Sequence, residues 1–300
     1  MAFALRDQMN TYSDCYWQSR DGLKLHYRDY AGGEPAAARL PVLCLPGLTR
    51  NARDFEVLAA RLAGAWRVIC PEMRGRGDSA YAKDSATYNP LQYVEDLGEL
   101  LTQAGIGRFV AVGTSLGGLM TMVMAMTMPE RIAGVILNDI GPEIEAAGLE
   151  RIRDYVGQGR SFPTWMHAAR GLEETQAAAY PEYKVDDWLA MAKRVMTLSS
   201  NGRIVFDYDM KIAEPFSQPG GEAGVDMWPG LDGLIGKPAL FLRGALSDIL
   251  SADVLRRMAE RVPGAKTVTV AQTGHAPTLD EPDVVAAIDR LLARVDANPA

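Results

Sequence analysis

Six short, nearly continuous apolar runs recur along this chain, and they constrain its fold more than any other feature. They are residues 40–46, 66–71, 108–113, 132–139, 238–244 and 266–271. Apolar runs of this length that do not alternate with polar residues are typical of parallel strands covered on both faces. Stretches with helical spacing separate most of them, at 52–63, 90–104, 116–128, 251–262 and 281–294. Strands that alternate with helices predict an α/β fold with a mostly parallel, doubly wound sheet.

Two segments depart from this alternation. Near the start, Asp21-Gly22 is a hairpin signal, followed by residues that alternate between apolar and polar, so we expect an antiparallel N-terminal hairpin at the edge of the sheet. Between residues 139 and 238 the pattern predicts helices and no good strand, over a connection far longer than usual. We therefore predict an α/β core of residues 1–141 and 236–300, with a helical cap, residues 142–235, inserted after the sixth strand.

Composition narrows the classes of partner. The net charge of −7 argues against a nucleic-acid surface, and no apolar stretch approaches the length of a membrane span. The first residues lack a basic region followed by an apolar run, so no secretory signal is expected there. The scattered cysteines, with Cys44 and Cys70 inside apolar runs, are expected to be reduced, as in a cytoplasmic protein. The oligomeric state stays open.

Ser115 is the candidate nucleophile. It follows a predicted strand, opens a predicted helix and lies in the pattern G-x-S-x-G, as Gly113-Thr114-Ser115-Leu116-Gly117. A sharp turn from strand to helix needs glycine on both flanks, because a side chain there would strike the neighbouring strand or helix. The start of the helix also supplies free N–H groups where negative charge develops.

A serine hydroxyl needs a base to accept its proton, and three histidines are available. His26 is expected on the solvated face of the hairpin, and His167 on a cap helix. His275 follows the last strand, on a loop at the carboxyl edge of the sheet, where the Ser115 turn also lies. We therefore predict His275 as the base.

Two carboxylates compete for the place beside the base. Asp248 follows the next-to-last strand and gives the chain order serine, aspartate, histidine. Asp139 ends the strand that comes directly after the nucleophile's helix and is the alternative. The prediction is Asp248. For the oxyanion hole we expect the backbone N–H groups of Leu116, directly after the nucleophile, and of Leu48, in the loop that Gly47 begins.

With these motifs the chain resembles the α/β-hydrolase fold family, in its capped serine-hydrolase branch. The resemblance covers nearly all of residues 20–295 and rests on "PGLTRNARDF", "PEMRGRGDS", "VGTSLGG", "RGALSD" and "GHAPTLDEP". Two positions depart from the family pattern. Pro46-Gly47 stands where the family often has His-Gly, which removes a usual loop-ordering side chain, and Gly75-Arg76-Gly77 stands where it often has Gly-His-Gly. The resemblance implies hydrolysis of an ester-like bond through an acyl-enzyme.

The leading hypothesis is thus a serine esterase, of carboxylesterase type, for a small to medium, partly apolar substrate. Lactone hydrolysis and carbon–carbon bond hydrolysis on the same triad are alternatives. A non-catalytic ligand receptor is the alternative hypothesis outside the enzymes. The cap is rich in aromatic and methionine side chains, of which Trp165, Trp188, Met227 and Trp228 are the candidate substrate contacts. No cofactor and no metal are expected, since the chain lacks the G-x-G-x-x-G spacing at "GTSLGG" and any histidine-rich metal motif.

Overall fold

The computed structural model describes residues 12–33, 39–217 and 226–297. In this part of the chain, eight strands form a central sheet in the order β1-β2-β4-β3-β5-β6-β10-β11. The strands are β1 (Ser13–Gln18), β2 (Lys24–Tyr30), β3 (Val42–Leu45), β4 (Val68–Pro71), β5 (Phe109–Thr114), β6 (Ile132–Asn138), β10 (Ala239–Gly244) and β11 (Lys266–Val270). The β1–β2 hairpin pairs antiparallel and joins β4 antiparallel, while the pairs from β4 to β11 are parallel. The predicted α/β-hydrolase fold is confirmed.

All six apolar runs became strands of this sheet. Four of them, β3, β4, β5 and β6, are buried along nearly their whole length because helices cover both faces. The last strand, β11, is different. It lies at the edge of the sheet, and its residues are exposed or half-buried, so the expectation of full coverage does not extend to it.

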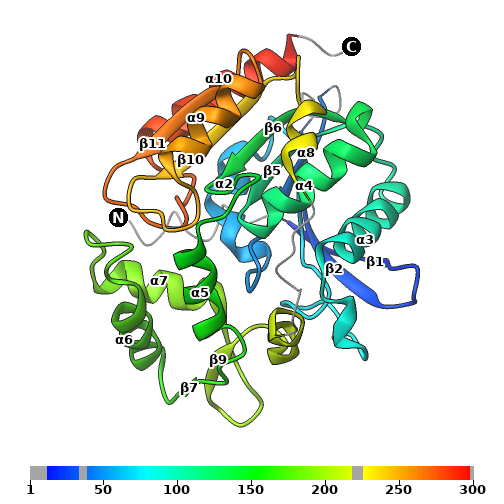
Figure 1. The fold of residues 1–300 in the computed structure, drawn as a ribbon. Helices are drawn as coiled ribbons and strands as arrows, with labels where there is room; N and C mark the ends of the chain where they lie inside the picture. The colour runs from blue at the N-terminus through cyan, green and yellow to red at the C-terminus, as the bar shows by residue number, and fades with distance from the viewer. Residues whose placement is uncertain (1–11, 34–38, 218–225, 298–300) are drawn as a thin grey trace.

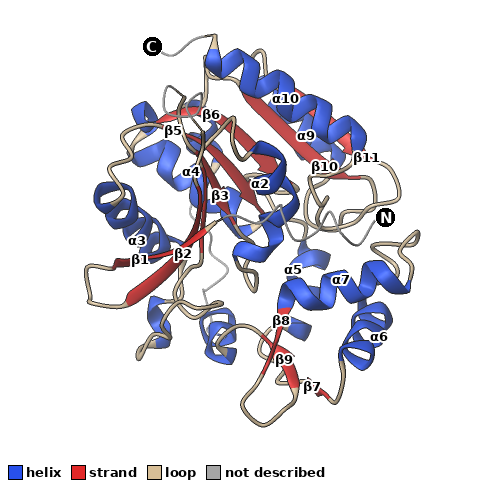
Figure 2. Ribbon diagram, turned by 180° about the vertical axis from the view of Figure 1, so that it is seen from behind, coloured by secondary structure: helices blue, strands red, loops and turns tan. Residues whose placement is uncertain are grey.

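Helices pack on both faces of the sheet (Figures 1 and 2). Successive residues of a strand point to opposite faces, so Leu43 and Leu45 belong to one apolar core and Val42 and Cys44 to the other. The first core includes side chains of α3 (Pro90–Gln103), α4 (Leu116–Thr127), α8 (Trp228–Asp232) and α9 (Ala252–Arg261), and the second those of α2 (Glu56–Leu62) and α10 (Pro282–Asp296). Short 3₁₀ helices at Ala52–Phe55, Ser85–Thr87 and Pro129–Arg131 complete the connections.

The long connection between β6 and β10 holds α5 (Ala146–Tyr155), α6 (Trp165–Gln176), α7 (Val185–Val195) and the 3₁₀ helix Met210–Ser217. It also holds a small antiparallel sheet in the order β7-β9-β8, from Ser161–Phe162, Ile204–Phe206 and Met196–Leu198. Our expectation of helices alone was therefore wrong, because these strands are too short to leave a strand pattern in the sequence. The helices α6 and α7 share an apolar core of their own, separate from the two cores of the sheet.

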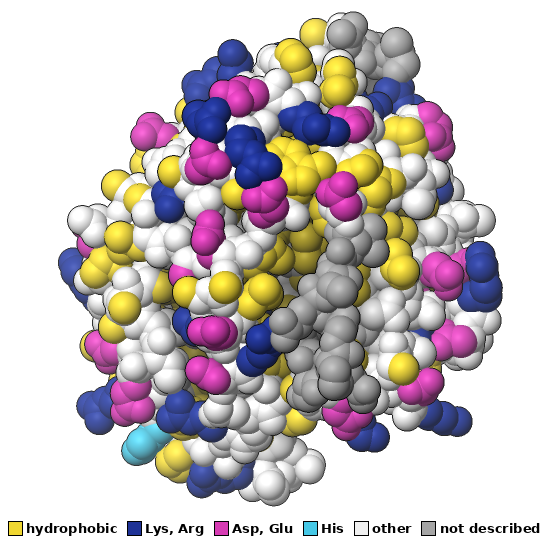
Figure 3. Space-filling view, viewed as in Figure 1, with side chains coloured by type: hydrophobic (Ala, Val, Ile, Leu, Met, Phe, Trp, Pro, Cys, Tyr) yellow, Lys and Arg dark blue, Asp and Glu magenta, His cyan; other side chains and the backbone are white. Residues whose placement is uncertain are grey.

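The C-terminal part of this connection belongs to the central layers. Helix α8 packs against α4 and lies beside it in Figure 1. The contact is close, since a Cβ atom added to Gly230 would lie 2.7 Å from the carbonyl oxygen of Met122. Figure 3 shows acidic and basic side chains interspersed over one face of the molecule. Among the described residues, no helix has the length and apolar character needed to cross a bilayer.

Candidate active site

Ser115 lies in a strained turn between β5 and α4. Its φ of 53° and ψ of −118° are values that a residue with a side chain rarely adopts. The flanking glycines allow this turn. A Cβ atom at Gly117 would lie 2.0 Å from the carbonyl oxygen of Leu45 in β3, and one at Gly113 would lie 2.4 Å from that of Gly117. The physical reason inferred from the sequence therefore holds in the structure.

His275 is within hydrogen-bond distance of Ser115. Its Nε2 lies 2.8 Å from the Ser115 Oγ, and its Nδ1 lies 2.7 Å from Oδ2 of Asp139. The three side chains follow β5, β11 and β6, and they meet because the carboxyl ends of these parallel strands share one edge of the sheet. Asp139 is fully buried, whereas His275 is partly open to the pocket.

The carboxylate beside His275 is thus Asp139, and the expectation of Asp248 is corrected. Asp248 instead forms a two-point ion pair with Arg151 of α5, at 2.5 and 2.7 Å. Burial raises the pKa of Asp248, but the hydrogen bonds and the positive charge of Arg151, together with a backbone hydrogen bond, outweigh burial and hold that pKa below its usual value. Both aspartates lie at the same edge of the sheet, and sequence order alone did not separate them. Asp139 ends the strand that pairs directly with β5.

The loop after β10 supports Asp139 instead of supplying the carboxylate. The Gly244 N–H donates to Oδ1 of Asp139 at 2.8 Å, and the Ser247 hydroxyl donates to Oδ2 at 2.6 Å. Asn138 connects the strand end before Ser115 with the loop of His275, since its side-chain amide donates to Thr114 Oγ1 and to the Pro277 carbonyl. Neither Ser247 nor Asn138 was identified from the sequence. Their positions, beside one candidate aspartate and at the strand end, were the available signals.

Gly47 begins a tight turn that approaches Ser115. An added Cβ atom on Gly47 would lie 3.6 Å from the Ser115 Cβ, and the Arg50 N–H donates to the Gly47 carbonyl at 3.2 Å. Leu48 lies within this turn and lines the same pocket as Ser115. Leu116 is the first residue of α4, where N–H groups have no partner inside the helix. The structure therefore brings the backbone of both predicted donors to the nucleophile.

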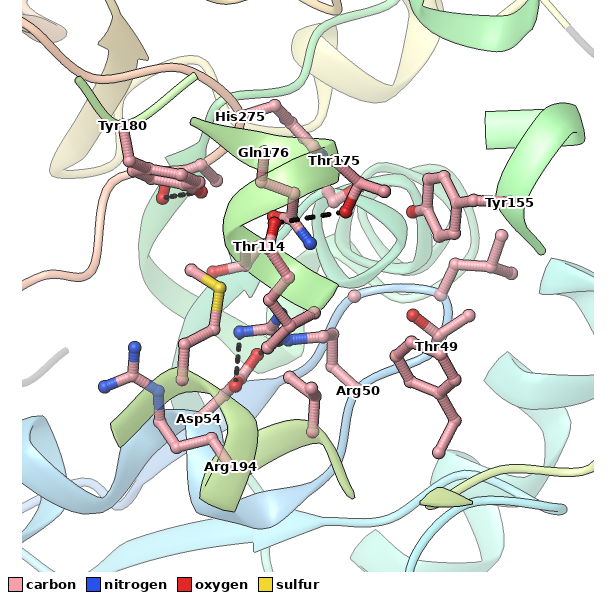
Figure 4. A pocket seen from close by; sticks show the side chains of 18 of the residues that line it. Thr49, Arg50, Asp54, Thr114, Tyr155, Thr175, Gln176, Tyr180, Arg194 and His275 are labelled. Atoms are coloured by element: carbon pink, nitrogen blue, oxygen red, sulfur yellow. Dashed lines mark hydrogen bonds and ion pairs between the residues drawn. The ribbon is translucent and has the colours of Figure 1, made fainter. Parts of the chain in front are cut away.

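A cavity of about 390 Å³ opens above Ser115 and His275. Its walls come from the loop after β3, from the connection between β6 and β10 and from the loop of His275 (Figure 4). Arg50 and Asp54 form an ion pair in one wall. Arg194 lies in the wall as well, and among the described residues its guanidinium group has no hydrogen-bond or ion-pair partner.

The four candidate substrate contacts do not line this cavity. Trp188 is 1 % exposed and packs in the core of α6 and α7, and Trp165 packs against the same core. Met227 is buried in the central core beneath α8, and Trp228 donates its indole N–H to Glu143 at 2.8 Å. The aromatic and methionine residues that do line the cavity from this connection are Tyr155, Phe162, Tyr180, Met191, Met196 and Phe206. Helical spacing alone did not distinguish the side of each helix that faces the core from the side that faces the cavity.

The other two histidines lie away from Ser115. His167 lies on a helix, α6, as expected, and is exposed there, but His26 is buried, which corrects its placement on a solvated face. Burial lowers the pKa of His26, but the hydrogen bond and negative charge of Glu72, together with the hydrogen bond to Asp14, outweigh burial and raise that pKa above its usual value. His26, Glu72 and Asp78 lie close enough to hold a cation. Glu72 is already engaged, because its oxygens also accept the N–H groups of Ala52 and Asp78.

The chain is similar to known hydrolases along most of its length. The model of the alpha/beta hydrolase family matches residues 42–288. The crystal structure of an alpha/beta hydrolase from Novosphingobium aromaticivorans is similar, with a TM-score of 0.91 and 62 % identity over 95 % of this chain and 99 % of that one.

Two curated relatives carry a described activity. A 3-hydroxybutyrate-oligomer hydrolase from Cupriavidus necator is 32 % identical over 85 % of this chain and 88 % of its own length. A 2-(acetamidomethylene)succinate hydrolase from Mesorhizobium japonicum is 24 % identical over 81 % of this chain and 84 % of its own.

Proposed function

Because the chain belongs to the alpha/beta hydrolase family, we propose that it is a serine hydrolase that cleaves a carboxylic ester with Ser115, His275 and Asp139. The observation that carries this proposal is the continuous contact from Ser115 Oγ through the imidazole of His275 to the buried Asp139 carboxylate. A serine held in this way can give up its proton at the moment of attack.

The proposed reaction has two steps. Ser115 Oγ attacks the ester carbonyl while Nε2 of His275 takes its proton, and the alcohol then leaves with that proton, which yields an acyl-enzyme. Water next attacks the acyl carbon, again through His275, and releases the acid and the free serine. Asp139 keeps a proton on Nδ1 of His275 and stabilises the imidazolium. The N–H groups of Leu48 and Leu116 stabilise the oxyanion in both steps.

We propose that the connection between β6 and β10, up to the 3₁₀ helix Met210–Ser217, acts as a cap over this site. Support comes from its side chains in the wall of the cavity and from its separate apolar core. A cap excludes water and so strengthens the hydrogen bonds to the oxyanion. The tight packing of α8 on α4 supports a cap that ends before that helix, so we count α8 with the α/β core. The free thiols of Cys44 and Cys70, buried in adjacent strands, fit a reducing, cytoplasmic location.

Among esters, we favour those that carry a free carboxylate. The cavity wall contains a guanidinium group, that of Arg194, that no described residue neutralises, and a substrate carboxylate would pair with it. The names of both curated relatives point the same way. An oligomer of a hydroxy acid is joined by ester bonds and ends in a carboxylate, and a succinate derivative is also an acid. Exposed Asp154 and Asp280 at the cavity keep its overall charge from being strongly positive, so the effect should be local to Arg194.

Turnover of short esters tests the proposed reaction. Wild-type protein should hydrolyse p-nitrophenyl butyrate, and Ser115→Ala should lower kcat on the order of 10⁴-fold or more while circular dichroism and the melting temperature stay unchanged. A panel with lactones and diketones in the same assay separates the ester hypothesis from its two alternatives. Turnover of no substrate by folded wild-type protein would favour a ligand receptor instead.

A matched pair of substrates tests the preference for acids. We expect 3-acetoxybutyrate to have a higher kcat/KM than its neutral amide, 3-acetoxybutanamide, with acetate release as the readout. Arg194→Gln should lower kcat/KM for the acid by roughly 10–100-fold, the value of a charged hydrogen bond, and leave the amide unchanged. Arg160→Gln is the control, since Arg160 also lines the cavity but pairs with Glu174 at 3.6 Å. Equal losses for acid and amide would refute the role of Arg194.

A further inference from the structure

We propose that Arg76 is a positioning residue that holds the oxyanion-hole turn, residues 47–50, in its active geometry. This inference rests on the proposed esterase function. Arg76 lies in the loop after β4 and does not line the cavity, so it does not touch the substrate. It acts on the turn through a hydrogen bond, in which its Nε–H donates to the Leu48 carbonyl at 2.9 Å.

The turn needs this support because the peptide group between Leu48 and Thr49 has no hydrogen bond inside the turn that would fix its orientation. In a four-residue turn the first carbonyl accepts from the fourth N–H, and the central peptide rotates at small cost. Here the Arg50 N–H donates to the Gly47 carbonyl. The Gly47 carbonyl and the Leu48 N–H belong to one trans peptide group and point in opposite directions, so the Leu48 N–H points away from this hydrogen bond. The central carbonyl, that of Leu48, is the one that Arg76 holds. The two hydrogen bonds together fix the peptide groups on both sides of Leu48.

Arg76 itself is rigid. Its side chain is 0 % exposed, and its Nη1 donates to the Arg74 carbonyl at 2.7 Å and to the Tyr93 hydroxyl at 2.9 Å. The Tyr93 ring lies 4.8 Å from the guanidinium carbon. These contacts hold the side chain from several sides, so its position can order the turn.

The charge of Arg76 has no carboxylate partner among the described residues. Burying a guanidinium group without a counter-ion is costly, and its carbonyl and ring contacts offset the cost only in part. One nitrogen, Nη2, is buried with no hydrogen-bond partner in this part of the chain. A positive charge kept behind the turn at such cost favours negative charge on the other side, where the oxyanion would form.

The two departures from the family pattern meet at this contact. Pro46 precedes the turn and lacks a side chain that can donate a hydrogen bond to it, and Arg76 supplies that donor from another loop. The neighbouring Glu72 holds the chain just after this turn, since its Oε1 accepts the Ala52 N–H at 3.1 Å. The loop after β4 thus orders the loop after β3 at two points.

A split between ground-state and transition-state effects tests the proposal. With p-nitrophenyl butyrate, Arg76→Gln should lower kcat by roughly 10–100-fold with KM nearly unchanged, because the oxyanion forms only in the transition state. Affinity for butylboronic acid, which forms a tetrahedral adduct with the serine, should fall by a similar factor, and inhibition by the product butyrate should not change. Arg76→Lys keeps a charged donor and should restore part of kcat.

Arg74→Gln is the matched control, because Arg74 is a buried arginine of the same loop that pairs with Asp96 and Asp21. It should lower the melting temperature without the selective loss of kcat and boronate affinity. If Arg76→Gln does not fold, Tyr93→Phe removes one acceptor of Arg76 and should show the same pattern more weakly. Unchanged kcat and boronate affinity in the Arg76 variants, or equal losses in the Arg74 control, would overturn the proposal. A wild-type protein without ester turnover would instead overturn the proposed function.

Discussion

At the scale of single residues, the turn at Ser115 depends on the missing side chain of Gly117. Gly117→Ala would place a Cβ atom 2.0 Å from a backbone oxygen of β3, and neither the strand nor the helix can move without opening the sheet. We expect a loss of several kcal/mol in the free energy of unfolding, about 3 or more, together with loss of activity. Gly98→Ala in α3 is the control, since nothing lies within 4 Å of its added Cβ, and it should stabilise the protein by about 0.5–1 kcal/mol. Urea denaturation of both variants decides the comparison.

The identity of the carboxylate is also a single-residue question. Asp139→Asn keeps the shape of the side chain but cannot stabilise the imidazolium of His275, so kcat should fall by roughly 10³–10⁴-fold. Asp248→Asn removes only the ion pair with Arg151 and should keep kcat within about tenfold of wild type, since its effect on the reacting groups is indirect. Steady-state kinetics with one ester measures both. The reverse order of losses would restore Asp248 as the partner of His275.

At the scale of elements, the segment between helices α6 and α7 holds the loop that carries His275. The Tyr180 hydroxyl donates to the Ala276 carbonyl at 3.1 Å, and the Gly274 N–H donates to the Ala179 carbonyl. Tyr180 in turn packs against Trp188, with ring centroids 6.2 Å apart. The apolar core of α6 and α7 therefore reaches the His275 loop through the aromatic contacts among Tyr180, Tyr183 and Trp188.

We expect this arrangement to distinguish aromatic residues that stabilise the fold from those that contact a substrate. Trp188→Ala should lower the free energy of unfolding by about 3–5 kcal/mol and leave the ratio of kcat/KM between short and long esters unchanged. Phe162→Ala, in the cavity wall, should shift that ratio toward bulkier esters at a smaller cost in stability. Trp228→Ala serves as the control outside the cavity and should change neither the ratio nor kcat. A changed ratio in the Trp228 variant would mean that α8 contributes to the site.

At the scale of the whole molecule, an ion pair joins the proposed cap to the α/β core. Arg151 lies on α5 and Asp248 on the loop after β10, and both are about one-third exposed, so the pair contributes only about 0.5–1 kcal/mol. Because the folded pKa of Asp248 lies below its usual value, this stability is present above the ordinary carboxyl pKa and is lost as the pH falls through the folded pKa. The difference in unfolding free energy between wild type and Asp248→Asn should therefore shrink from neutral pH to around pH 3. A difference that stays constant over this range would argue against the pair as its source.

The sequence alone determined the sheet, its helices and two of the three candidate catalytic side chains. The continuous apolar runs can be recognised without tertiary information, and the spacing of Gly113, Ser115 and Gly117 is one that a sharp turn requires. His275 followed because loops at the carboxyl ends of parallel strands meet at one edge. These features are local, or depend only on the order of strands and helices.

Tertiary structure decided the rest, because it depends on directions that the chain order does not encode. Asp139 and Asp248 both reach the edge of the sheet, but Arg151 of α5 binds Asp248, while Gly244 and Ser247 hold Asp139 beside His275. The aromatic residues of the cap show helical spacing whether they face its core or the cavity, so Trp188 became core and Phe162 became wall. The hydrogen bond from Arg76 to Leu48 joins two loops that are far apart in the sequence. They lie side by side because the strands that precede them, β3 and β4, pair in the sheet.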